Sequence, residues 1–139
     1  MSVYTGEISF DTKGEVDIIN ITDDVERIVG KSGIAVGLVN CFVGGATGAV
    51  SVIEYEPGLL EDFPEMLQRI APKNIEYAHH RTWDDGNGHS HVRATLIGPE
   101  ITLPVRKGKM IRGTWQQVIF IELDVRHRSR TIYVTVTGE

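Results

Sequence analysis

Hydrophobic and polar residues alternate over much of the chain, and this period of two predicts β-strands. The alternation is clearest near the end of the sequence, where Ile132, Val134 and Val136 are separated by threonine and tyrosine. Segment 34–43 is instead nearly continuous in apolar residues, which favours a buried central strand. The expected strands cover residues 3–10, 15–20, 34–43, 49–54, 94–97, 101–105, 118–123 and 131–137.

Residues 22–30 repeat their apolar positions every three or four residues and predict a first helix. Val25, Ile28 and Val29 form its apolar face, and Thr22 or Asp23 could cap its first turn. Glycines at 30 and 33 are typical of a helix end.

A second helix is expected over residues 59–71, which Pro72 would end. Pro64 is expected in its first turn, where a missing N–H is tolerated. Strands outnumber helices and are interrupted by them. The sequence therefore predicts a single α+β domain over 1–139, with a mainly antiparallel sheet and two or three helices.

Composition and charge narrow the function classes. Hydrophobic residues make up 41% of the chain and charged residues 24%, as in ordinary globular proteins. No apolar run approaches the roughly 20 residues of a membrane span, and the N-terminal residues lack the pattern of a secretory signal. The single cysteine, Cys41, cannot form an internal disulfide and is expected to be a small buried hydrophobe. We therefore expect a cytoplasmic protein without membrane contacts.

The net charge of −5 is unevenly distributed. Residues 81–130 hold nine bases and five acids, whereas residues 1–80 hold five bases and thirteen acids. Two interpretations stay open, an anion site in the second half or an unevenly charged surface. Nucleic acid is not an expected partner, because the chain is acidic overall and carries no recognisable binding motif.

Four of the five histidines fall within residues 77–93, beside two aspartates and an asparagine. If residues 89–91 are extended, His89 and His91 point to one face and could chelate Zn²⁺ or Mg²⁺ together with His79 or His80. Asp85 could ligate the metal or hold a histidine tautomer. The alternative is a set of polar histidines at a loop or a subunit interface.

Three further features could bind ligands. The glycine-rich loop 44–48 offers backbone N–H groups to an anion, although a tight turn explains it as well. Glu54 and Glu56 would share a strand face if that segment is extended. Arg126, Arg128 and Arg130 would also share a face, and their mutual repulsion calls for an anion or carboxylates between them. These arginines are phosphate candidates, with a solvated strand edge as the alternative.

Several short motifs, specific only in combination, resemble the YjbQ family, which is often labelled secondary thiamine-phosphate synthase. They cover nearly the whole chain and comprise Thr47-Gly48-Ala49 with Glu54, Tyr77-x-His79, Asn87-Gly88-His89-Ser90-His91, Gly98, Pro104-Val105, Gly113-Thr114-Trp115-Gln116, Glu122-x-Asp124 and Arg128-x-Arg130. The chain departs from the family where Gly45-Ala46-Thr47 replaces His-Thr-Thr and where Val-Arg-His-Arg follows Asp124 in place of Gly-Pro-Arg.

The resemblance implies a compact α/β sandwich, assembly as a homotrimer and a polar site close to subunit contacts. It also implies thiamine-phosphate synthase activity, the joining of a pyrimidine diphosphate to a thiazole phosphate. From chemistry and resemblance together, we expect the catalytic residues to be His79, Asp85, His91 and Glu54. The expected substrate-binding residues are Thr47, Asn87, Trp115, Gln116, Arg128 and Arg130. The expected metal ligands are His79, His89 and His91.

Three functions follow for these residues. The first is the synthase activity, which could be a side activity because dedicated synthases are β/α barrels that need about 250 residues. The second is a histidine-ligated metal-dependent hydrolase. The third is a non-catalytic trimeric module that binds a small phosphorylated or carboxylate ligand.

Overall fold

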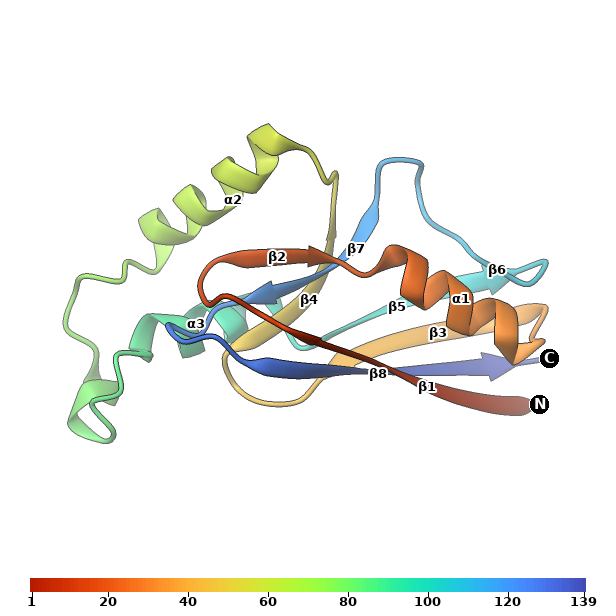
Figure 1. Ribbon diagram of the computed structural model, residues 1–139, viewed down its shortest axis with the longest axis horizontal. Coiled ribbons are helices and arrows are strands. Elements are labelled where there is room, and N and C mark those ends of the chain that lie inside the picture. Colours follow the sequence, from red (N-terminus) through yellow and green to blue (C-terminus); the bar gives the residue numbers. More distant parts are fainter.

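The computed structural model describes residues 1–139 as an α+β fold with two antiparallel sheets, three α-helices and one 3-10 turn (Figure 1). The elements follow in the order β1 (Ser2–Asp11), β2 (Asp17–Asn20), α1 (Thr22–Ser32), β3 (Val36–Val43), β4 (Gly48–Ile53), α2 (Pro57–Ile70), η1 (Ala78–Arg81), α3 (Gly88–Ile97), β5 (Glu100–Arg106), β6 (Lys109–Met110), β7 (Gln117–Glu122) and β8 (Ser129–Gly138). None of the helices combines the length and the hydrophobicity of a membrane span.

Strands from distant parts of the sequence pair in both sheets. The five-stranded sheet has the order β1-β8-β3-β5-β6, and the three-stranded sheet has the order β2-β7-β4. Every pair is antiparallel. The pairing of Ser2 with Gly138 brings the two chain ends together at one end of the molecule, whereas η1 and the start of α3 lie at the other end (Figure 1).

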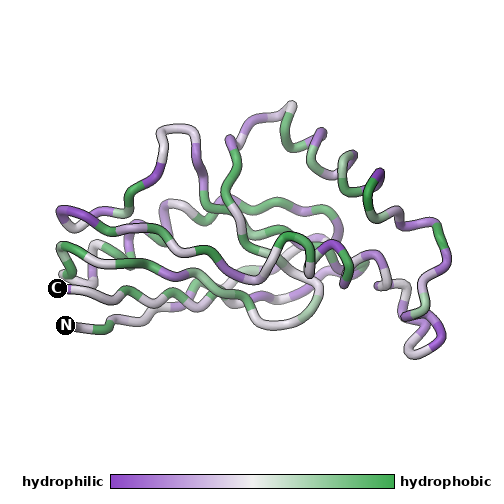
Figure 2. Tube along the Cα trace, turned by 180° about the vertical axis from the view of Figure 1, so that it is seen from behind, coloured by the Kyte–Doolittle hydropathy of each residue, from purple (hydrophilic) through white to green (hydrophobic).

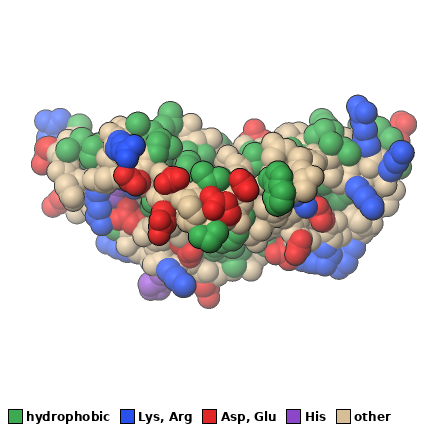
Figure 3. All heavy atoms as spheres, turned by 90° about the horizontal axis from the view of Figure 1, so that it is seen from above, with side chains coloured by type: hydrophobic (Ala, Val, Ile, Leu, Met, Phe, Trp, Pro, Cys, Tyr) green, Lys and Arg blue, Asp and Glu red, His purple; other side chains and the backbone are tan.

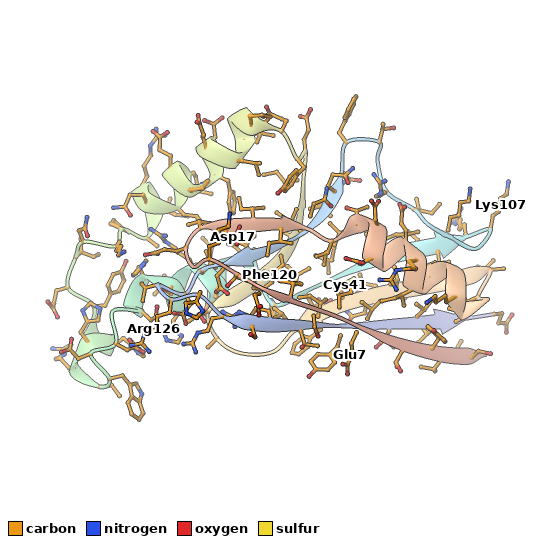
Figure 4. The ribbon with its side chains drawn as sticks, in the orientation of Figure 1. Glu7, Asp17, Cys41, Lys107, Phe120 and Arg126 are labelled. Carbon is orange, nitrogen blue, oxygen red and sulfur yellow. The ribbon has the colours of Figure 1, made fainter.

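Strand β7 is buried on both of its faces. Val118 and Phe120 belong to the core shared with α1 and the five-stranded sheet, whereas Ile119 and Ile121 pack with Leu67 of α2 and Ala94 of α3. Figure 4 shows the Phe120 side chain within the body of the molecule. Burial of one such side chain contributes about 1.5–3 kcal/mol. The three-stranded sheet is thus the middle layer, and it fixes the position of the loops at its two ends.

Helix α1 begins differently from the prediction. Its N-cap is Ile21, which forms no side-chain cap, and the Thr22 hydroxyl donates to Asn20 Oδ1 at 2.7 Å. The cap expected from Thr22 or Asp23 is therefore wrong. Gly33 ends the helix in the left-handed region, at φ 69°, as its position in the sequence predicts.

Helix α2 starts two residues before the predicted boundary because Glu56 caps it. The Glu56 carboxylate accepts the backbone N–H groups of Gly58 and Leu59 at 2.9 and 2.6 Å. Pro57 occupies the first turn, so Pro64 lies inside the helix and its expected first-turn position is wrong. The helix stands off from the sheets in Figure 1, and Leu67 is its one buried residue.

Residues 94–97 form the end of helix α3 and not the predicted strand. The inward positions of this helix repeat at intervals of four, but they include His89, Ser90 and Arg93, which are buried polar residues. A search for apolar periodicity misses a helix whose inner face is polar.

Strand β3 lies in the interior of its sheet order, as predicted, but it is buried on one face only. Val39, Cys41 and Val43 face the core, whereas Leu38 and Phe42 are exposed. Figure 2 shows how hydrophobic and hydrophilic positions alternate along the strands. Burial raises the pKa of the Cys41 thiol to about 12, so this cysteine is neutral and unreactive at ordinary pH.

Candidate functional site

Three predicted site residues meet at the end of the molecule opposite the chain termini. His79 lies on η1, Asp85 lies in the following loop, and His91 lies in the first turn of α3. One ligand atom from each lies within 4.8 Å of the other two. The imidazole centroids of His79 and His91 are 4.5 Å apart, and His79 Nε2 lies 3.3 Å from Asp85 Oδ1. His79, Asp85 and His91 have the donor types of a divalent metal site, and together they form a candidate metal centre.

A backbone carbonyl orients the His91 ring. His91 Nδ1 lies 3.1 Å from the Ala46 carbonyl oxygen, which can only accept a hydrogen bond. The proton of a neutral ring is therefore on Nδ1, and the lone pair of Nε2 is free. Metal-binding histidines are commonly held by such a hydrogen bond from the opposite nitrogen.

His79 Nε2 is buried and has no hydrogen-bond partner. The nearby Asp85 carboxylate is close enough for an ion pair but not aligned for a hydrogen bond. A buried polar atom without a partner is unfavourable by about 1–3 kcal/mol. A cation bound between the imidazole and the carboxylate would remove this penalty.

Asp85 is held as an anion. Its Oδ1 accepts the Asn87 backbone N–H at 3.0 Å, and this hydrogen bond, followed by the proximity of His79, lowers the pKa of the carboxyl group. The carboxylate is therefore available to a metal throughout the neutral range.

Asn87 connects the segments around the site by hydrogen bonds. Its side-chain oxygen accepts the Ser90 hydroxyl at 2.9 Å and the Val125 backbone N–H at 3.0 Å. The residue is buried. Asn87 thus connects the Asp85 loop, α3 and the β7–β8 loop, and its geometry is that of a residue that positions the site.

His89 points away from the other two histidines, so the expected ligation of a common metal by His89 is wrong. Residues two apart on a helix project about 200° apart, whereas the prediction assumed an extended strand. The His89 side chain is 1% exposed, and its Nε2 lies 2.7 Å from Glu15 Oε2. His80 is also outside the cluster, 3.7 Å from Glu76.

Two of the three clustered arginines, Arg128 and Arg130, pair with carboxylates. Arg130 Nε donates to Glu122 Oε1 at 2.8 Å, and Arg128 donates to Asp124 Oδ2 at 3.0 Å from Nε and 2.8 Å from Nη2. Both carboxylates are fully buried. Of the two alternatives that the sequence left open, an anion or carboxylates, the structure has carboxylates.

Thr47 links these two ion pairs. Its hydroxyl donates to Asp124 Oδ2 at 3.0 Å and accepts from Arg130 Nη2 at 2.9 Å. Burial raises the pKa of Asp124, but hydrogen bonds from the Arg126 backbone, Arg128 and Thr47 outweigh burial and lower it. Asp124 is therefore ionised, and Thr47 has a structural place in the network.

The β7–β8 loop also presents positive charge to solvent. The segment between Glu122 and Ser129 is not a strand, so Arg126 does not share an extended face with the other two arginines. Arg126 is exposed, its side chain forms no ion pair, and Figure 4 shows it at the end where α3 begins. Arg128 is 45% exposed despite its pairing with Asp124.

Glu54, Trp115 and Gln116 lie at the opposite end of the three-stranded sheet. Gly48, next to the candidate metal centre, pairs with Glu122, whereas Ile53 pairs with Gln117. Five residue-to-residue steps along β4 separate these two pairs by about 17 Å. Within one chain, the residues predicted to share a site are therefore divided between two places.

Sequence reasoning missed one contributor to the site, and it missed the partner of His89 outside the site. The Ala46 carbonyl has no side-chain signal, because any residue provides a carbonyl. Glu15 lies 74 positions from its partner His89. A lone acid next to a turn glycine gave no indication of this contact.

The comparisons with known proteins agree with this fold. The chain matches the model of the family described as UPF0047 protein YjbQ-like over residues 6–139. A UPF0047 protein of Methanothermobacter thermautotrophicus is 40% identical over 139 residues, which are 100% of this chain and 95% of that protein. UPF0047 protein YjbQ of Escherichia coli O157:H7 is 26% identical over 121 residues, which are 86% of this chain and 87% of that protein.

Solved structures show the same architecture. A crystal structure of a YbjQ-like protein of unknown function from Sulfolobus solfataricus P2 has a TM-score of 0.94 and 38% identity, covering 99% of each chain. A YjbQ/UPF0047 protein of Clostridium acetobutylicum has a TM-score of 0.85 and 30% identity, covering 94% of this chain and 98% of that one. This chain therefore belongs to the YjbQ-like UPF0047 family.

Proposed function

We propose that this chain is a metal-dependent enzyme that acts on a small phosphorylated substrate, with a divalent metal bound by His79, Asp85 and His91. The observation that carries the proposal is the buried His79 Nε2, which has no hydrogen-bond partner and lies close to Asp85 and His91, two side chains that could bind a metal. The hydrogen bond from His91 to Ala46 supports it, because it leaves the second ring nitrogen free.

The donor set favours Zn²⁺ or another transition metal. Two imidazoles and one carboxylate suit such ions, whereas Mg²⁺ prefers a shell of oxygen atoms. A divalent metal held by His79, Asp85 and His91 would polarise a phosphoryl oxygen and activate water. Hydrolysis is therefore the reaction class that this site supports best.

The chain's own residues have separate tasks in this proposal. Asp85 provides the negative charge, and the Ala46 carbonyl holds His91 in the tautomer that ligates. Arg126 and Arg128 provide positive charge on the exposed side of the β7–β8 loop, where a phosphate would lie. Their assignment to the phosphate rests on this placement.

Thiamine-phosphate synthase activity is the second candidate, supported by the family resemblance and by the same arginines. It requires that pyrophosphate leave a pyrimidine methylene group and that a thiazole phosphate attack there. Glu54, Trp115 and Gln116 of the same chain lie too far from the histidines to take part. The synthase proposal therefore includes a homotrimer in which a neighbouring copy provides these residues.

Metal binding is the first test. Protein stripped with a chelator should bind Zn²⁺ at one site per chain in calorimetry, and His91→Ala should abolish this binding with a nearly unchanged melting temperature. His127→Ala is the matched control, because His127 is exposed and outside the cluster. Binding by His91→Ala that equals the wild type would refute the site.

Turnover is the second test. The metal-loaded protein should hydrolyse a phosphomonoester or inorganic pyrophosphate, and His91→Ala should not. Formation of thiamine phosphate from the pyrimidine diphosphate and thiazole phosphate would favour the synthase instead. Phosphate-ester binding without any turnover would favour the non-catalytic module.

A further inference from the structure

We infer that a second site, separate from the candidate metal centre of His79, Asp85 and His91, binds a small organic cation such as an alkylated ammonium. The site is a pocket of about 240 Å³ where β2, the end of β4 and the loop before β7 meet. Its lining includes Asn20, Glu54, Tyr55, Glu56, Trp115 and Gln117.

The pocket carries negative charge that nothing in the chain neutralises. Glu54 is exposed, and its carboxylate forms no hydrogen bond or ion pair. No lysine, arginine or histidine lines the pocket. Figure 3 shows acidic side chains gathered near the middle of the upper face with hydrophobic side chains among them, and basic side chains mostly toward the ends. Such a surface attracts cations.

Trp115 is 71% exposed and yet belongs to a well-anchored loop. Arg112 Nη1 donates to the carbonyl oxygens of Gly113, Thr114 and Gln116 at 3.4, 3.4 and 3.1 Å, and its Nε lies 3.1 Å from Glu26. The indole is therefore presented to solvent from a fixed backbone. A large aromatic ring at such a position is well suited to bind a cation on its face.

Tyr55 provides a second fixed aromatic ring. Its hydroxyl donates to the Ile18 carbonyl at 2.7 Å, which holds the ring at the pocket. A cation lodged beside Tyr55 and Trp115 would gain ring contacts in addition to the charge of Glu54.

The chemistry of the lining favours an organic cation over a metal ion. A metal needs several converging oxygen atoms. The Glu56 carboxylate is already occupied by the first N–H groups of α2, and the Asn20 amide donates to Gln117 at 3.2 Å. Only the Glu54 carboxylate is free to bind a ligand, whereas Tyr55 and Trp115 both offer aromatic surface.

The test uses choline and its uncharged analogue, in which carbon replaces the nitrogen. The measurement is tryptophan fluorescence with calorimetry on a Trp83→Phe background, so that Trp115 is the only reporter of the two tryptophans. Choline should bind saturably, and the uncharged analogue should bind at least tenfold more weakly. Glu54→Gln and Trp115→Leu should each weaken choline binding by about tenfold.

Two controls test whether choline binds in this pocket. One tests for general attraction to the acidic surface, and the other tests for binding at the candidate metal centre. Glu61→Gln removes an exposed acid of α2 that does not line the pocket and should bind choline like the parent protein. His91→Ala should also bind choline normally, because His91 does not line the pocket. Equal binding of the uncharged analogue, insensitivity to Glu54→Gln, or displacement of choline by millimolar Mg²⁺ or Ca²⁺ would overturn the proposal.

Discussion

Glu15 contacts three cationic or protonatable side chains where the β1–β2 loop meets α2 and α3. Its carboxylate lies 2.7 Å from His89, 2.6 Å from Lys73 and 3.8 Å from Arg93. Burial raises the pKa of Glu15, but Lys73 and His89 outweigh burial and lower it below 4.5. Because the folded pKa is depressed, the stability that Glu15 contributes is present above pH 4.5 and is lost as the pH falls through the folded pKa.

His89→Ala should therefore destabilise the protein, in contrast to His91→Ala. Removal of the buried ring leaves Glu15 with one fewer partner and opens a cavity, so we expect the free energy of unfolding at neutral pH to fall by about 2–4 kcal/mol. Urea denaturation followed by circular dichroism measures the change. A variant as stable as the wild type would show that the Glu15–His89 contact is dispensable.

At the scale of elements, the packing of α3 against η1 brings the histidines together. Gly88 opens α3, and a Cβ atom at this position would lie 2.6 Å from Cβ and 2.8 Å from Cγ of Tyr77. Tyr77 immediately precedes η1, which carries His79. The absent side chain of Gly88 thus permits the close approach on which the candidate metal centre depends.

Gly88→Ala should push η1 away from α3, weaken Zn²⁺ binding at least tenfold and lower the melting temperature. Gly30→Ala is the matched control, because nothing lies within 4 Å of a Cβ at that position of α1. This control should bind metal normally and gain about 0.5–1 kcal/mol of stability from its higher helix propensity. Normal metal binding by Gly88→Ala would contradict the proposed dependence on close packing.

The elements also show what a sequence can predict. Strand β8 was predictable because Ile132, Val134 and Val136 alternate with outward residues, a pattern that only local geometry determines. Helix α3 was not predictable. Its buried His89 is stabilised by contact with Glu15, and the two residues are far apart in the sequence. Most strands were therefore predicted and this helix was missed.

The candidate site was predicted in part for the same reason. His79, Asp85 and His91 lie within thirteen residues, so their proximity in sequence indicated proximity in space. The ion pairs of Arg128 with Asp124 and of Arg130 with Glu122 require a known loop conformation. Spacing alone revealed the crowding of the arginines but not which groups relieve it.

At the scale of the whole molecule, the five-stranded sheet has one open face. Phe42 of β3 pairs directly with Tyr133 of β8, and both are exposed. Val36 and Leu38 of β3 and Val3 of β1 are exposed as well. Contiguous apolar surface of this kind is typical of subunit interfaces, in line with the proposed homotrimer.

Light scattering of the wild type should give three times the 15.4 kDa mass of the chain. Replacement of Leu38 and Phe42 by lysine should shift the mass to that of a monomer, because charges at the centre of an interface are unfavourable. Ile75→Lys, an exposed apolar residue outside the sheet, is the control and should keep the wild-type mass. A wild type that is monomeric at micromolar concentration would refute this assembly.

The strand order also constrains how the chain can fold. In the three-stranded sheet, β2 and β4 each pair only with β7, and in the five-stranded sheet β1 pairs only with β8. Residues 2–20 therefore have no sheet partner until residues 117–138 have been made. On the ribosome, the first two strands must wait for the last two, and loop closure over such separations is slow. Until then their apolar side chains remain unprotected, so synthesis is a stage at which this chain is exposed to aggregation.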